Sequence, residues 1–465
     1  MKKRLRGLRR CLWFGLGMAL MVGWGGSAAA QNGSPLDGIE VLDLPTAAKI
    51  ALAGNPSLAA ARERVNQARE VLQQARAAYW PRLDATATAS QVNLSNNAYQ
   101  QQLLTARIID PQATLKNPEE YYSAGLQLSW LLFDGFARKF NLAAARYGQE
   151  ASTAARDDAQ RLLLSAVTNA FLSAQLAQEN IAIAKADEAF NQRQLTEAQL
   201  RYKVGTGALS NVLNFQVKVN QAKALRIQAD QAFHTALVSL AALLGLPQSA
   251  LPQHVRLASL EPAAPTELAT PQLDAILDTA FKQRPDLQQN DRVVQQAQAG
   301  VEVARAGYYP NLSFSADWTG ERAGDTHFSG DDFGDTLALT LSYNIFAGGL
   351  TRARHQEAKA RLNEVEKSLQ SAKVSVASEV QRVVTQVLSA QQQLSLQQAN
   401  ADLVQQNRDL VEKEYKAGVG SLVRLNEAQR DLIAAQVSLA SARAALHQAW
   451  YDMQAATGEI LATFR

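Results

Sequence analysis

One short segment occurs twice, as YKVGTGAL at residues 202–209 and as YKAGVGSL at residues 415–422. A second pair, AYWPRL at residues 78–83 and GYYPNL at residues 307–312, precedes each copy. The copies lie much further apart than the roughly 20 to 50 residues of a solenoid repeat. The sequence therefore indicates one large unit that has been duplicated.

The segments leading into the repeated motif are predicted to be very long helices. No Gly or Pro occurs from Leu350 to Ala417, and only Gly148 interrupts Phe136 to Val204. At 1.5 Å per residue each helix would reach roughly 100 Å, too long for an ordinary core helix. The Gly-x-Gly motifs at 205–207 and 418–420 can end a helix and reverse the chain. Two long helical hairpins with exposed tips result.

Apolar residues along these hairpins follow heptad steps of three and four, which is typical of coiled-coil packing. The first repeat is less regular, because Arg226 takes one seam position. An ordinary two-stranded coiled coil is the alternative, but strand-like segments interrupt the helices. The seams are Val376, Val380, Val383, Val387, Ala390 and Leu394; Leu425, Ala428, Leu432, Ala435, Leu439, Ala442, Leu446, Ala449, Met453 and Ala456; and Val212, Phe215, Val219, Ala222, Ala229, Phe233, Ala236 and Leu240.

Four strands of about ten residues are predicted, two in each repeat. The residue before Pro81 and the residue before Pro310 are pushed out of helical geometry, so strands should begin there. Leu83–Ser90, Leu126–Leu132, Leu312–Trp318 and Leu337–Ile345 alternate apolar with small or polar residues. This pattern is typical of an outer-membrane barrel wall, and a pair of soluble hairpins on a core is the alternative.

Aromatic side chains are expected to gather at the helix-side ends of these strands, as in a membrane-interface girdle. Four strands cannot close a barrel, and an open sheet edge in lipid would leave backbone groups unpaired. Several protomers must then share one barrel. The interface aromatics are Tyr79, Trp80, Trp130, Phe133, Tyr308, Tyr309, Tyr343 and Phe346.

The first thirty residues are typical of a secretory signal peptide, with a basic head, an apolar run from Leu12 to Trp24 and Ala28–Ala30 before a cleavage site at Gln31. An uncleaved anchor is the alternative, but the apolar run is short. Removal takes six basic residues and changes the formal net charge from +3 to −3. It also removes Cys11, the sole cysteine, which excludes disulfides and Cys-ligated metals.

No enzyme motif stands in a suitable context, and no catalytic residue, cofactor or bound metal is predicted. The five histidines are scattered singly. Asp331, Asp332 and Asp335 could bind a divalent cation weakly, but a solvated loop explains them better. Clustered Lys and Arg on one face, which nucleic-acid binding would need, are not evident.

In combination these motifs resemble the TolC-type outer-membrane factor family of efflux and secretion channels. The resemblance covers nearly the whole mature chain. It implies an α+β membrane protein that forms a homotrimer, with four strands per protomer in a shared 12-stranded β-barrel and the hairpins in a periplasmic α-barrel. The motifs that carry it are Asn55-Pro56 and Arg284-Pro285, the two Tyr-x-Pro entries, LFDG at 132–135 with IFAG at 345–348, the Tyr-x-x-Gly tips, and the terminal Gly245-Leu246-Pro247 and Thr457-Gly458.

The resulting division is a signal peptide at 1–30, a first repeat at 31–247, a linker at 248–283, a second repeat at 284–458 and a tail at 459–465. The resemblance implies that the linker belongs to a collar around the helices, and a flexible tether is the alternative over Leu260–Thr270. It also places the polar segments Asn93–Tyr121 and Gly320–Gly334 outside the cell.

The resemblance further implies that the tips dock a periplasmic adaptor and that residues just beyond them form the channel entrance. Asn211 and Arg424 stand where acids are common in the family, so Arg424 is expected to pair with Glu427 or Asn211. A solvated helix face is the alternative. The tip residues are Gly205, Thr206, Gly207, Gly418, Val419, Gly420 and Ser421, and the entrance residues are Tyr202, Ser210, Asn211, Tyr415, Arg424 and Glu427.

The predicted function is passive conduction across the outer membrane of a Gram-negative bacterium. Substrate would come from an inner-membrane RND, ABC or MFS transporter through the adaptor, and outer-membrane lipid would surround the strands. A periplasmic coiled-coil scaffold without channel activity is the alternative. Efflux and polypeptide secretion are both left open.

Overall fold

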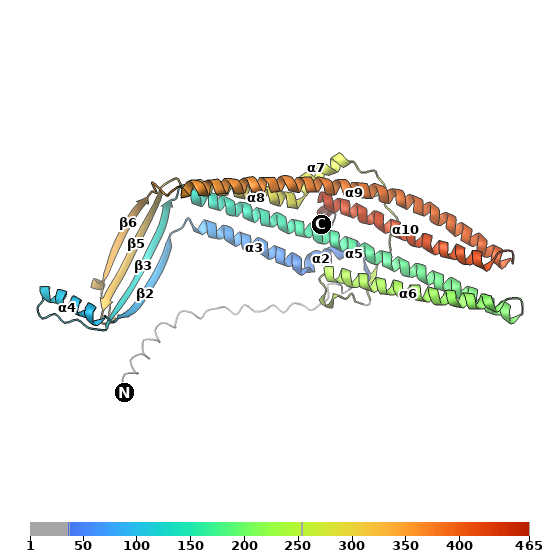
Figure 1. Cartoon of the computed structure of the whole chain (residues 1–465), viewed down its shortest axis with the longest axis horizontal. Coiled ribbons are helices and arrows are strands. Elements are labelled where there is room, and N and C mark those ends of the chain that lie inside the picture. The colour runs from blue at the N-terminus through green and yellow to red at the C-terminus, as the bar shows by residue number, and fades with distance from the viewer. Residues whose placement is uncertain (1–35, 37, 253, 465) are drawn as a thin grey trace, which may run out of the picture. The chain divides into compact units, whose positions relative to one another are not determined.

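The computed structural model, shown in Figure 1, describes residues 36, 38–252 and 254–464. The chain divides into two compact units, residues 1–40 and 41–465. In the first unit the Ile39 amide donates a hydrogen bond to the Leu36 carbonyl at 3.1 Å. The predicted signal peptide lies outside the described residues. All helices and strands of the described residues belong to the second unit.

In chain order the elements are β1 (Val41–Leu42), α2 (Leu44–Gly54), α3 (Pro56–Ala77), β2 (Arg82–Val92), α4 (Asn96–Ile109), β3 (Glu119–Phe133), α5 (Ala137–Lys203), α6 (Leu209–Leu243), the 3-10 turn η1 (Pro247–Ser249), β4 (Arg256–Leu257), α7 (Leu273–Gln283), α8 (Pro285–Ala306), β5 (Asn311–Ala323), the 3-10 turn η2 (Gly330–Asp332), β6 (Phe333–Ser342), α9 (Leu350–Lys416), α10 (Leu422–Thr457) and α11 (Ile460–Thr463).

The two predicted long helices are confirmed as α5 and α9, each of 67 residues. Each begins directly after a residue in the left-handed region, Phe136 with φ 71° and Gly349 with φ 87°. That geometry turns the chain sharply from strand into helix. Among the described residues, no helix is long and apolar enough to cross a membrane.

The helices pack side by side as a wall, visible in Figure 1. Near the sheet, α3 packs on α5, α5 on α8, and α8 on α9. Toward the tips, α6 packs on α5, α5 on α10, and α10 on α9. The wall therefore has α3 and α6 along one edge and α9 along the other.

The second repeat's predicted heptad seam forms the largest part of one buried core, where α7, α8, α9 and α10 meet. Val380 and Val387 are fully buried there. The members are Ala280, Leu287, Val376, Val380, Val383, Val384, Val387, Ala449, Met453 and Ala456.

Each Pro-initiated helix is tied to the end of its own repeat. The Asn55 amide donates to the Leu243 carbonyl at 2.8 Å, at the end of α6. At the equivalent position the buried Arg284 donates to the Ala456 carbonyl at 3.0 Å and forms ion pairs with Asp286 and Glu379. These contacts close each repeat into a unit.

The sheet has the order β2-β3-β5-β6 and is antiparallel throughout. Its register places the predicted apolar residues on one face, for example Leu83 opposite Leu128 and Leu312 opposite Leu341. The predicted strands are confirmed with shifted ends. Tyr343 and Ile345 lie beyond the end of β6, and the segment predicted as a polar outer loop at 93–121 contains α4 and the start of β3.

The linker between the repeats is held by polar side chains from three helices. Gln175 of α5 donates to the Ala258 and Ser259 carbonyls, and Gln391 of α9 donates to the Glu267 and Ala269 carbonyls. His447 of α10 contacts Glu267 and the Glu261 carbonyl. The linker thus crosses the helix wall at one level in a fixed course, and it ends in α7, an element that the sequence did not predict. The domain boundaries themselves remain a prediction.

Candidate functional site

The two hairpin tips have the same backbone design. Gly205 and Gly418 adopt φ values of 79° and 80°. In each tip, the amide of the residue after this glycine donates a closing hydrogen bond to the carbonyl five residues earlier. Thr206 N donates to Arg201 O at 2.9 Å, and Val419 N donates to Glu414 O at 3.1 Å. This is the left-handed helix ending that glycine allows. The duplicated motif therefore encodes a duplicated turn.

The second glycine of each tip is required for a different reason. A Cβ at Gly207 would lie 2.9 Å from the Arg201 Cβ, and one at Gly420 would lie 2.8 Å from the Tyr415 backbone nitrogen. Both turns are packed too closely for any side chain there. After the second turn, Ser421 caps α10 by accepting from Arg424 N at 3.2 Å.

Just above the tips, the two hairpins share one hydrophobic cluster. Phe215 of α6 is fully buried and meets the Tyr415 ring of α9 edge-on, with centroids 6.5 Å apart. The Asn426 amide donates to Asn214 Oδ1 at 3.0 Å, which joins α10 to α6. The buried members are Phe190, Leu195, Ala198, Phe215, Val219, Val411, Leu425 and Ala428.

Charged groups surround this cluster. Arg201 lies over the Tyr415 ring at 5.6 Å and pairs with Glu197 at 2.6 Å. Burial raises the pKa of the Tyr415 hydroxyl above its ordinary value of 10.0, and so the ring stays neutral at physiological pH. Arg424 pairs with Glu414 at 3.4 Å.

A buried polar layer lies on the side of the cluster away from the tips. Asp187 of α5 accepts from the Gln429 amide of α10 at 2.8 Å and from the Asn191 amide at 3.1 Å. Burial raises the pKa of Asp187, although both amide hydrogen bonds oppose this. Gln194 Oε1 and Gln429 Oε1 are buried there without a hydrogen-bond partner among the described residues. Buried acceptors without a partner cost free energy, so this layer stabilises the hairpins less than a fully paired layer would.

The structure brings some predicted entrance residues together and leaves others apart. Tyr415 lies against the shared cluster, and the contact of Arg424 is with Glu414 rather than with the expected Glu427 or Asn211. The side chains of Tyr202, Ser210 and Glu427 are exposed. Sequence reasoning missed Glu414, Arg201, Asn214, Asn426 and Asp187. One signal was available, because Arg201 and Glu414 each directly precede the tyrosine of a repeated tip motif.

The sheet carries aromatic side chains at both ends. At the helix-side end, the Trp130 indole donates to the Tyr79 carbonyl at 3.1 Å, and Arg138 lies over the Tyr79 ring at 5.2 Å. Of the other predicted aromatics, Trp80, Tyr308, Tyr309, Tyr343 and Phe346 are exposed and Phe133 is half-buried.

Further along the sheet, Trp318 stacks on Phe333 with centroids 4.3 Å apart, and Trp318 lies opposite Leu126 of β3. Tyr121 and Tyr122 lie at the far end of β3, opposite Ala323 and Arg322. The sequence analysis did not predict this second group of aromatics. From Tyr122 to Trp130 the strand is about 26 Å long, which at a tilt of about 40° covers about 20 Å of an outer-membrane apolar band about 25 Å tall.

Comparison with protein families gives a match to the model described as outer membrane efflux protein, over residues 47–246 and 276–459. The chain belongs to this family. Its fold is that of the TolC-type channels, as the sequence predicted, and it is an outer-membrane protein whose helices extend into the periplasm. The family consists of channel proteins and not of enzymes.

Several characterised proteins of this family resemble the chain. It is 29% identical over 414 residues to the pyoverdine export outer membrane protein OpmQ of Pseudomonas aeruginosa, covering 88% of this chain and 83% of OpmQ. It is 28% identical to the alkaline protease secretion protein AprF of the same organism, over 44% of this chain and 42% of AprF. The outer membrane protein TolC of Vibrio cholerae is 22% identical over 66% of this chain and 65% of TolC.

Solved structures agree on the fold. The outer membrane protein VceC from Vibrio cholerae superposes with a TM-score of 0.71 at 18% identity, over 89% of this chain and 96% of VceC. The CusC channel gives a TM-score of 0.73 at 19% identity, over 92% of this chain and 95% of CusC.

Proposed function

We propose that this protein is the exit duct of a tripartite export system, working as a homotrimer with a periplasmic adaptor and an inner-membrane transporter. The observation that carries the proposal is that both layers of the protomer are open at both edges. The sheet ends in β2 and β6, and the helix wall ends in α3 with α6 and in α9. Unpaired strand edges are not tolerated in lipid, so β2 needs a β6 from a neighbour.

The edges of the helix wall support the same assembly. On α6, a complete heptad row of exposed residues faces away from α5 and includes Leu213, Val217, Ile227 and Val238. The row consists of positions 213, 217, 220, 224, 227, 231, 234 and 238. On α9, Leu396, Leu403 and Leu410 are exposed at steps of seven. Two such rows on opposite edges fit each other when copies form a ring.

Export of a small molecule is favoured over secretion of a polypeptide by the extent of the similarities. OpmQ, named for pyoverdine export, matches along most of the chain, whereas AprF, named for protease secretion, matches along less than half. The expected inner-membrane partner is a resistance–nodulation–division, ABC or major-facilitator transporter.

The decisive experiment combines assembly with conduction. The mature chain, purified from outer membranes, should run as a heat-sensitive trimer and give single-channel currents in a planar bilayer. Crosslinking in cells followed by mass spectrometry should recover an adaptor and one transporter. A monomer recovered from the soluble periplasm without currents would support the scaffold alternative.

Docking at the tips is tested separately. Val419 is 81% exposed at the second tip, and Thr206 is exposed at the first. Val419→Asp together with Thr206→Asp should abolish adaptor crosslinking and export, while the trimer and its conductance remain. The matched control is Gln102→Asp on α4, which is exposed and lies at the opposite end of the protomer. Equal adaptor crosslinking in the tip variant and the control would refute docking at the tips.

A further inference from the structure

Basic residues gather where the helices meet the sheet. Arg76 and Arg305 lie in the last turns of α3 and α8, and Lys139 and Arg352 lie in the first turns of α5 and α9. The two members of each pair occupy equivalent positions in the two repeats. Arg76 and Arg305 each lie three residues before the Tyr of a Tyr-x-Pro entry. Lys139 and Arg352 each lie four residues after the Gly of a Phe-x-Gly motif. These four residues are called the basic belt.

The belt has little compensating charge within the protein. All four side chains are exposed. Within the described part of the chain, Arg76, Lys139 and Arg352 form no ion pair, and Arg305 makes a long contact of 3.6 Å with Glu302. By contrast, neighbouring Arg138 is paired with Asp134 at 3.1 Å and donates to the Leu132 carbonyl. Arg138 therefore stabilises the turn, whereas the belt residues are available to a partner.

The position of Lys139 and Arg352 opposes the usual preference of helix termini. A helix N-terminus carries a partial positive charge and favours acidic residues. Neither α5 nor α9 has an acidic residue in its first turn, and the Asp134 carboxylate, which accepts from the Arg138 amide at 2.9 Å, is already paired with the Arg138 side chain. A cation at the N-terminus of α9 is electrostatically unfavourable in the protomer alone, and at α5 Lys139 adds a second cation to a carboxylate that Arg138 already neutralises. The folding of these helices therefore does not explain the two cations.

The depth of the belt matches one layer of the membrane. Each belt residue lies within about one helical turn, roughly 5 Å, of the helix end that adjoins the sheet. The exposed aromatics Trp80, Tyr308 and Tyr309 mark the membrane interface at the same place. The headgroup layer of a bilayer is about 5 to 8 Å thick on each side. The four cations therefore lie at headgroup level on the periplasmic side.

We propose that the basic belt binds the phosphate headgroups of anionic phospholipids in the periplasmic leaflet of the outer membrane. Exposed Lys and Arg at headgroup depth attract anionic lipid, and their long apolar stems can lie along the helix while the charge meets the phosphate. Three protomers would supply a ring of such sites around the duct. The inference rests on the outer-membrane location and goes beyond the duct function.

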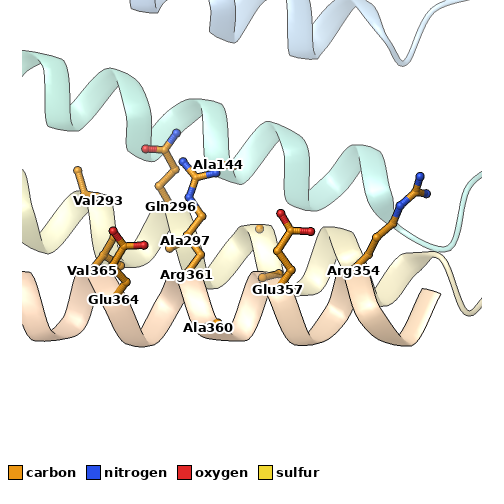
Figure 2. Close-up of a pocket in the computed structure, with 12 residues that line it drawn as sticks. Ala144, Val293, Gln296, Ala297, Arg354, Glu357, Ala360, Arg361, Glu364 and Val365 are labelled. Atoms are coloured by element: carbon orange, nitrogen blue, oxygen red, sulfur yellow. The ribbon is translucent and has the colours of Figure 1, made fainter. Parts of the chain in front are cut away.

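The groove between α8 and α9 extends this surface away from the sheet. It has a volume of about 670 Å³ and a largely small-residue floor that includes Ala144, Ala297 and Gly300. Figure 2 shows Arg354, Glu357 and Arg361 rising from one face of α9 into it, with the Arg354 guanidinium apart from the Glu357 carboxylate. Since Glu357 lies a further turn from the sheet, the part of the groove nearest the membrane is its positive end.

The test uses the full mature trimer in nanodiscs of phosphatidylethanolamine with about one fifth phosphatidylglycerol. Lipid retained by the protein is counted by native mass spectrometry after transfer to detergent. The variant carries Arg76→Gln, Lys139→Gln, Arg305→Gln and Arg352→Gln. Its matched control carries Arg64→Gln, Lys185→Gln, Lys367→Gln and Lys373→Gln, which removes the same charge from exposed positions beyond the headgroup layer.

Wild type and control should retain phosphatidylglycerol, and the belt variant should retain at least fivefold less, because each lost cation weakens binding to an anionic surface. A charge-keeping variant with Arg76→Lys, Arg305→Lys and Arg352→Lys should retain it as wild type does. Millimolar inorganic phosphate should not displace the lipid.

Equal retention of phosphatidylglycerol by the belt variant and the control would overturn the proposal. Loss of phosphatidylglycerol from the charge-keeping variant would overturn it too. Trimer conductance is measured in parallel, so a failure of lipid binding is distinguishable from a failure of the duct.

Discussion

At the scale of single residues, the tip glycines give the sharpest prediction. Gly420→Ala places a Cβ 2.8 Å from the Tyr415 backbone nitrogen, where backbone must move. We expect the tip to be destabilised by about 1 to 3 kcal/mol, the usual cost of forced backbone strain. Faster hydrogen exchange over residues 411–425 measures this.

The control for that change lies next to it. Val419→Ala truncates an exposed side chain in the same turn and should change stability by less than about 0.5 kcal/mol. If Gly420→Ala exchanges no faster than Val419→Ala, the close contact is not required for the turn.

The buried His447–Glu267 pair predicts a pH dependence. His447 Nδ1 lies 2.7 Å from Glu267 Oε1, and Nε2 lies 3.0 Å from the Glu261 carbonyl oxygen. Burial of the ring opposes its charge, but these two acceptors outweigh burial and raise the pKa of His447 above its ordinary 6.5. A raised folded-state pKa means that the stabilisation is complete below pH 6.5 and is lost as the pH rises through the folded-state value.

Thermal unfolding of the purified trimer checks this dependence. The wild-type midpoint should fall as the pH rises above 6.5. His447→Gln should lower the midpoint at pH 6 and flatten the curve, because an unpaired buried Glu267 is costly. The control, His254→Gln, removes an exposed histidine and should leave the curve unchanged. A His447→Gln curve parallel to that of wild type would assign the pH dependence to other groups.

At the scale of elements, the sequence predicts regular features well and local contacts poorly. The long helices followed from the absence of Gly and Pro, and the strand faces followed from a period of two, since both depend on many residues at once. Helix α4 was missed because its sequence is rich in Asn and Gln, polar residues that are also found in loops. The Arg424–Glu414 contact was missed because it depends on how α9 and α10 pack.

Phe215 tests whether the shared cluster keeps the two hairpins together. Phe215→Ala removes a fully buried ring between α6 and α9, at a cost of about 3 to 5 kcal/mol. We expect higher closed-state conductance of the reconstituted trimer, because the tips lose the contact that joins them. Phe233→Ala, further along α6 and only half-buried, is the control and should leave conductance unchanged. Equal conductance in both variants would remove the cluster from the entrance.

At the scale of the whole molecule, ring symmetry fixes which residues of neighbouring protomers meet. A closed ring has no axial shift between copies, so residues at equal distance from the tips face each other. Helix α9 runs toward the tips and α6 away from them, and Leu410 of one copy should therefore lie beside Val217 of the next. Leu396 is 14 residues from Leu410 and should lie beside Gln231, which is 14 residues from Val217. Cys11, in the predicted signal peptide, is the only cysteine in the chain, so introduced pairs have no competitor. Leu410→Cys with Val217→Cys, and Leu396→Cys with Gln231→Cys, should give oxidant-dependent covalent trimers on denaturing gels. Leu410→Cys with Val238→Cys, offset by about 30 Å along the helices, should give no covalent trimer.

Crosslinking by the offset pair, or by none of the three cysteine pairs, would show that α6 and α9 do not form the protomer boundary.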